Sequence, residues 1–142
     1  MTSATLKMLA RRGILIAAAA VVFAAAVAGV ASATPQTVTV TIQHSRFLPA
    51  HFLVRRGATV RFVITNLDPI DHEFLLGDET AQNRHETGTE PAHGAVPGEV
   101  SAPPGTTTET TYTFSRPGIV LLGCHAPGHY AYGMRGRVLV VY

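Results

Sequence analysis

The stretch Gly-Cys-His-Ala-Pro-Gly-His-Tyr-Ala-Tyr-Gly-Met spans residues 123–134 and lies between two apolar segments near the end of this 142-residue chain. Residues 119–123 before it and residues 135–141 after it have the apolar, β-branched composition of strands. The Pro-Gly pair inside the stretch predicts a tight reversal. The sequence therefore predicts a strand, a loop and a final strand, with Cys124 at the point where the first strand ends.

The rest of the chain beyond residue 33 alternates apolar and polar residues and lacks helical spacing. Alternation is clearest over residues 38–42, 60–64 and 108–114, as expected for strands with one buried face. Clusters of Gly, Pro and Asp separate these segments. About seven to eight short strands in about 110 residues predict an all-β sandwich with a single core.

The N-terminal segment has the composition of an export signal. Three basic residues precede an aliphatic run over residues 14–30, and the run closes on the small residues Ala31, Ser32 and Ala33. This pattern predicts a signal peptide over residues 1–33, with an uncleaved membrane anchor as the alternative. We therefore expect an exported protein, in the periplasm, the cell envelope or outside the cell, with one domain over residues 34–142.

Charge and cysteine content restrict the partners of that domain. Without the three basic residues of the leader, eight Arg and Lys stand against nine Asp and Glu. No basic stripe is present, which argues against nucleic acid. A lone cysteine cannot form an internal disulfide, so in an oxidising compartment Cys124 must be buried, paired with another chain or bound to something. We expect a monomer that associates with a membrane only if its leader is retained.

One long segment interrupts the strand pattern. Residues 77–105 are polar and rich in Gly, Pro, Thr and Glu, and they include His85 and His93. Loops of this length are either functional or mobile. We expect a solvated insertion with a single helical turn near residues 81–85, and a metal-handling role for its two histidines is the alternative.

The opening stretch also carries a set of metal-binding side chains. Cys124, His129 and Met134 offer a thiolate, an imidazole and a thioether. With a second imidazole they make the trigonal His, His and Cys set with a weak axial Met that is typical of electron-transfer copper sites. His72 is the best candidate for that imidazole, since it opens a short apolar strand after a loop. An inert buried cysteine and a core-filling methionine are the simpler alternatives.

At these residues the chain resembles the cupredoxins, most of all the auracyanin, azurin and plastocyanin group. The similarity rests on the pattern Cys124-x-x-Pro127-Gly128-His129-x4-Met134-x-Gly136, with a strand-opening histidine some 50 residues upstream. Further matching positions are Phe47-Leu48-Pro49, Val54, Gly57, Val60, Phe62 and Asn66. The resemblance implies a Greek-key β-sandwich that holds one type 1 copper, with His72, Cys124, His129 and Met134 as its ligands.

The chain departs from that family on both sides of His72. Asp71 stands where the family has glycine, and Glu73 stands where many relatives have an asparagine that hydrogen-bonds across the site. The combination His-Glu-Phe, followed by Leu-Gly-Asp and a histidine-bearing loop, is also similar to cupredoxins associated with copper resistance. Those relatives usually carry additional Met and His in the loop, and this loop has no Met.

The resemblance implies an electron carrier that is not an enzyme. Redox partners would dock transiently on an apolar patch around His129, formed by Ala126, Pro127, Ala131 and Tyr132. The alternative is a copper-tolerance protein that uses His85 and His93 to take up extra copper. A nitrite reductase or a multicopper oxidase fragment is disfavoured, because the sequence has no His-x-His pair for further copper ions.

Overall fold

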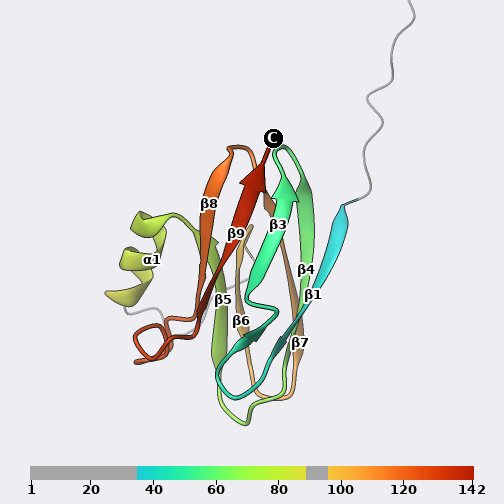
Figure 1. Ribbon diagram of the computed structural model, residues 1–142. Coiled ribbons are helices and arrows are strands. Elements are labelled where there is room, and N and C mark those ends of the chain that lie inside the picture. The colour runs from blue at the N-terminus through green and yellow to red at the C-terminus, as the bar shows by residue number, and fades with distance from the viewer. Residues whose placement is uncertain (1–34, 89–95) are drawn as a thin grey trace, which may run out of the picture. The chain divides into compact units, whose positions relative to one another are not determined.

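The computed structural model describes residues 35–88 and 96–142. The predicted signal peptide and His93 lie outside these residues. The described part is a two-layer β-sandwich, as the alternating sequence predicts, and its strand order is that of a Greek-key sandwich (Figure 1). None of its helices is long and apolar enough to cross a membrane.

The first layer is a four-stranded sheet in the order β2-β1-β4-β7. Its central strands are β1 (Gln36–Ile42) and β4 (Thr59–Asn66), which run parallel to each other. The two-residue strand β2 (Phe47–Leu48) and the strand β7 (Thr107–Thr113) form the edges. The fully buried residues Val40 and Ile42 of β1 and Val60, Phe62 and Ile64 of β4 stand at every second position, so the period-two pattern of the sequence marks the core face.

The second layer is a five-stranded sheet in the order β3-β9-β8-β5-β6. Its strands are β3 (His51–Arg55), β5 (His72–Gly77), β6 (Glu99–Ala102), β8 (Gly118–Gly123) and β9 (Arg135–Val141). Strands β8 and β9 pair antiparallel, with Gly123 opposite Arg135. The predicted strand, loop and strand around residues 123–134 are therefore present.

Four phenylalanines from both sheets fill the centre of the sandwich. The ring of Phe62 lies 5.2 Å from that of Phe74 and 6.4 Å from that of Phe114, and Phe47 packs edge-on against Phe74 at 5.9 Å. Buried aromatic side chains contribute much of the hydrophobic stabilisation of a core. This core ends beneath Cys124 and Met134, which are themselves fully buried members of the same cluster.

The segment predicted as a long loop is more ordered than expected. It contains the helix α1 (Glu79–Glu86) and the strand β6, and residues 89–95 between them are not described. The expected helical turn is there and extends to eight residues, because the side chain of Asp78 caps it by accepting a hydrogen bond from the Ala81 N–H at 2.9 Å. Together β6 and the short β2 bring the number of strands in the described residues to nine.

Helix α1 packs on the outside of the five-stranded sheet. Figure 1 shows it beside β8 and close to the loop that joins β8 to β9. The loops that follow β1, β4 and β8 lie toward the same end of the sandwich, the end that carries the predicted metal ligands. Helix α1 therefore borders that end from one side.

Candidate metal centre

The structure brings three of the predicted ligands to one point. The Nδ1 atoms of His72 and His129 are 3.2 Å apart, and the Cys124 Sγ atom lies 3.8 Å from the first and 3.4 Å from the second. Within the described residues, these three form the one group of His, Cys, Asp or Glu side chains close enough to share a metal ion. Residues separated by more than 50 positions thus converge.

The size of this triangle fits a bound metal ion. Bonds of about 2.0 Å to nitrogen and about 2.3 Å to sulfur, as in zinc sites, require edges of about 3.5 Å between nitrogens and about 3.7 Å between nitrogen and sulfur in a planar arrangement. The observed edges are within a few tenths of an ångström of these values. Two imidazoles and a thiolate are also the donors that copper favours.

The loop between β8 and β9 places its residues through its own main chain. The His129 N–H donates to the Ala126 carbonyl, the Met134 N–H to the His129 carbonyl, and the Cys124 N–H to the Met134 carbonyl, at 2.9, 2.9 and 3.1 Å. Gly128 and Gly133 have left-handed φ angles of 80° and 96°, which favour glycine. Met134 is fully buried, and its main-chain N–H and carbonyl groups are hydrogen-bonded to His129 and Cys124 respectively.

Burial determines the protonation of the cysteine. Cys124 is fully buried, and this raises the pKa of its thiol to about 11, although the Glu73 N–H, which donates to Sγ at 3.3 Å, opposes the shift. The thiol therefore keeps its proton near neutral pH until a metal ion replaces it. A bound copper ion would supply the ability to cycle between two oxidation states at this point.

Asp68 holds the other side of His72. Its carboxylate Oδ2 atom lies 2.9 Å from His72 Nε2, and its two oxygens accept hydrogen bonds from the N–H groups of His44 and Ser45 at 2.7 and 2.8 Å. Although burial opposes ionisation, these N–H bonds and His72 hold the pKa of Asp68 below its ordinary value. Burial, with a further contribution from His129, lowers the pKa of His72. Asp68 was not among the site residues predicted from the sequence, although a carboxylate four residues before a candidate ligand was a signal.

The side chain of Glu73 takes the place expected for the asparagine of many relatives. Its Oε2 atom accepts a hydrogen bond from the His125 N–H at 3.2 Å, so it ties β5 to the residue after Cys124. The same residue bonds the sulfur through its main chain. The departure at this position therefore preserves a bridge across the site.

Helix α1 supports the cysteine loop from outside. The Nε2 atom of buried Gln82 donates to the carbonyls of Leu75 and Leu121, and its Oε1 atom lies 2.7 Å from the ring of His125. The His125 ring points away from the metal site, as the strand pleat predicts, and stacks on Tyr130 at 4.6 Å. The close contact between the Gln82 side chain and residue 123 requires glycine at that position, since a Cβ atom at Gly123 would lie 2.4 Å from Gln82 Oε1.

Other histidines do not join the three ligands. His44 and His51 are exposed. His85 lies on α1 with its Nδ1 atom 3.1 Å from the Ala81 carbonyl and its Nε2 atom 3.1 Å from the carboxylate of Glu99. The alternative of an additional copper site at His85 would require this contact with Glu99 to be displaced.

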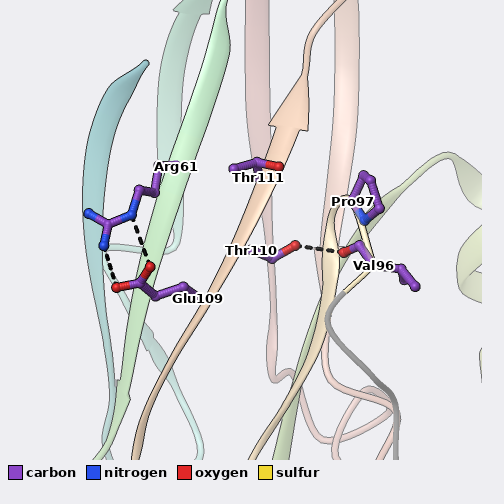
Figure 2. A pocket seen from close by; sticks show the side chains of 6 residues that line it. All are labelled: Arg61, Val96, Pro97, Glu109, Thr110 and Thr111. Atoms are coloured by element: carbon purple, nitrogen blue, oxygen red, sulfur yellow. Dashed lines mark hydrogen bonds and ion pairs between the residues drawn. The ribbon is translucent and has the colours of Figure 1, made fainter. Parts of the chain in front are cut away.

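A hollow of about 330 Å³ on the four-stranded sheet has few polar groups available to bind a ligand (Figure 2). Arg61 and Glu109 on its rim form a bidentate ion pair, and Thr110 donates to the Val96 carbonyl at 2.7 Å. The polar groups drawn there are thus largely paired with one another. The metal centre remains the candidate functional site.

Comparison with solved structures agrees with the fold. The chain superimposes on auracyanin B with a TM-score of 0.64, over 77% of this chain and 91% of that one, at 23% sequence identity. The sandwich therefore has the cupredoxin fold. The His, Cys and His cluster, together with the cuproprotein relatives described next, makes copper its cofactor. No protein-family model matches the sequence.

Sequence relatives define the group more closely. The chain is 39% identical over 116 residues to the copper-resistant cuproprotein CopI of Rubrivivax gelatinosus, a match that covers 79% of this chain and 70% of the relative. It is 28% identical over 142 residues to a protein of the same name from Pseudomonas aeruginosa, with 78% of each chain covered. The chain belongs to the CopI family of cuproproteins.

Proposed function

We propose that the protein is an exported one-electron carrier with a single type 1 copper. His72, Cys124 and His129 would hold the metal through two imidazoles and a thiolate, and the thioether of Met134 would be a fourth, weaker donor. The observation that carries the proposal is the triangle of donor atoms, with edges of 3.2 to 3.8 Å. Because the folded protein holds the donor atoms at this spacing, they would need little rearrangement, and the bound copper would supply one-electron exchange.

Electrons would pass through the edge of His129. This residue is only partly buried, whereas His72 and Cys124 are buried. Pro127, Ala131 and Tyr132 on the same loop are exposed, and the side chain of Tyr132 is 82% exposed. These residues support a small, transient docking surface for redox partners, as is usual in electron transfer. No catalytic role is part of this proposal.

The visible spectrum of the copper-loaded protein tests the proposal. We expect one copper per chain and an intense thiolate-to-copper band that disappears on reduction and returns on reoxidation. The Cys124→Ala variant should lack the band, and His51→Ala, an exposed histidine elsewhere, should keep it. A copper-loaded protein without the band, or a band that survives Cys124→Ala, would contradict the proposal.

A role in copper tolerance is a second candidate, and the name of the two relatives favours it. This role would use the same copper site, because His85 is engaged with Glu99. Deletion of the gene should lower the copper concentration that halts growth, and the wild-type gene should restore tolerance. If Cys124→Ala restores tolerance equally well, the copper site is not involved in it.

Metal analysis tests the alternative in which the loop histidines bind additional copper. The site described above predicts one copper per chain in wild type and in the His85→Ala, His93→Ala double variant. A second equivalent that this double variant loses would instead establish copper uptake by the loop.

A further inference from the structure

The turn between β1 and β2 contains two residues with an unusual backbone. His44 and Ser45 have φ angles of 54° and 51°, and the turn is closed by reciprocal hydrogen bonds between the main chains of Gln43 and Arg46 at 3.1 and 3.2 Å. Two consecutive left-handed residues define a type I′ turn, which is usually built from Asn and Gly. Neither His nor Ser is favoured there, so the conformation costs free energy.

This costly conformation directs two main-chain N–H groups at one carboxylate. The His44 N–H donates to Asp68 Oδ1 at 2.7 Å, and the Ser45 N–H donates to Oδ2 at 2.8 Å. Successive N–H groups that converge in this way form an anion-binding concavity. The turn therefore clamps the carboxylate of Asp68, whose Oδ2 atom also contacts His72.

The loop that carries Asp68 is itself fixed. Buried Asn66 donates through its side chain to the carbonyls of Ile70 and Ala102, both at 2.8 Å, and accepts a hydrogen bond from the Asp68 N–H at 2.9 Å. Asp68 is only 8% exposed. Its carboxylate thus has one orientation, with Oδ2 placed 2.9 Å from His72 Nε2.

The acceptor on Nε2 decides which ring nitrogen of His72 carries the proton. A neutral imidazole has one N–H, and a carboxylate can only accept from it. This acceptor therefore favours the tautomer with the proton on Nε2, in which the lone pair of Nδ1 points to Cys124 and His129. A carboxylate on the outer nitrogen of a metal-bound histidine also raises the basicity of the ring.

We propose that Asp68 is a positioning residue for the copper site, which keeps His72 in the Nε2–H form and lowers the reduction potential by stabilising the more highly charged oxidised copper. The inference deepens the proposed function and rests on it for its copper readouts. A buried negative charge near a metal ion favours copper(II) over copper(I), because the attraction grows with the charge of the ion. Asp68 also favours copper(II) by raising the basicity of the His72 ring, because a more basic nitrogen donor stabilises copper(II).

The test compares two Asp→Asn substitutions. Asp68→Asn should raise the equilibrium constant for one-electron reduction of the copper-loaded protein at least about tenfold, which is about 59 mV. Asp71→Asn is the matched control, since Asp71 precedes His72 directly but is exposed and makes none of these contacts. It should change the constant by less than about threefold, because solvent screens an exposed charge. Equal shifts in the two variants would overturn the proposal.

A second measurement requires no variant and no copper. Nitrogen NMR of the copper-free wild-type protein at neutral pH should show the His72 ring protonated on Nε2 and unprotonated on Nδ1. A proton on Nδ1 would overturn the proposal even if Asp68→Asn does not fold. Absence of the thiolate-to-copper band in wild type would instead refute the proposed function, so the two failures are distinguishable.

Discussion

The two sides of the metal centre are built in different ways. On one side, the loop from Cys124 to Met134 supplies a thiol, an imidazole and a thioether from eleven consecutive residues, held by hydrogen bonds within the loop. On the other side, His72 stands alone and is positioned by Asp68, which is held in turn by the 44–45 turn and by Asn66. A contiguous motif therefore carries most of its own geometry, whereas a single ligand depends on contacts between distant residues.

The largest difference between the two sides is expected when either histidine is replaced by glycine and imidazole is added. His129→Gly leaves a gap next to solvent, so added imidazole should restore copper binding and the thiolate-to-copper band. His72→Gly leaves a gap in a place where the ring is only 1% exposed, and it strands the Asp68 carboxylate. Imidazole should therefore not restore that variant.

Titration of both variants with imidazole, followed by visible absorption, measures this difference. Circular dichroism of the copper-free variants controls for folding. Equal rescue of the two would contradict the contrast in burial between the two ligands.

The second largest effect is expected for Asn66→Ala, which should lower the stability of the loop that holds His72. The substitution leaves the Ile70 and Ala102 carbonyls and the Asp68 N–H without their partner in a buried loop, so unfolding free energy should fall by about 2–4 kcal/mol. Urea unfolding of the copper-free protein measures the change. Thr107→Ala removes one exposed hydrogen bond to Thr65 and should cost less than about 0.5 kcal/mol. A similar cost for the two would show that Asn66 does not organise the loop.

The two sides should also lose stability at opposite ends of the pH range, the His72 side in acid and the Cys124 side in alkali. The pKa of His72 is lowered by burial, so the unfolded chain takes up a proton first and stability falls as the pH drops below about 6.5. The low pKa of Asp68 adds a further loss below about pH 4. The pKa of Cys124 is raised to about 11, so its contribution is lost as the pH rises from about 9 toward 11.

Urea unfolding of the copper-free protein across pH measures both declines. Cys124→Ala should reduce the alkaline decline and leave the acid one in place. A variant that changes both declines equally would show that they do not arise from separate sides of the site.

The smallest effect is expected at the turn that clamps Asp68. His44→Gly keeps the N–H group and removes the strain of a left-handed φ angle, so unfolding free energy should rise by about 0.5–1 kcal/mol with an unchanged copper spectrum. Gln43→Gly is the matched control, because this exposed residue of the same turn has no left-handed φ angle to relieve. It should lower stability by a similar amount, and stabilisation by both would contradict the turn geometry.

Much of the fold could be predicted from local patterns. The alternation over residues 38–42 and 60–64 marks strands with one buried face, and these became β1 and β4. The segment at 77–105 was the exception. Strand β6 is only four residues long and α1 has few apolar residues, so neither has a periodic signal, and both depend on packing against β5 and β8.

Three candidate donors could be predicted from local sequence, because the spacing of Cys124, His129 and Met134 along one loop is a local property that survives in the folded chain. The way in which His72 is held could not be predicted in the same manner. The roles of Asp68, Gln82 and the 44–45 turn come from contacts between residues far apart in the chain, and such contacts form only when the two sheets pack and bring the loops to one end of the sandwich. Sequence spacing carries no information about those distances.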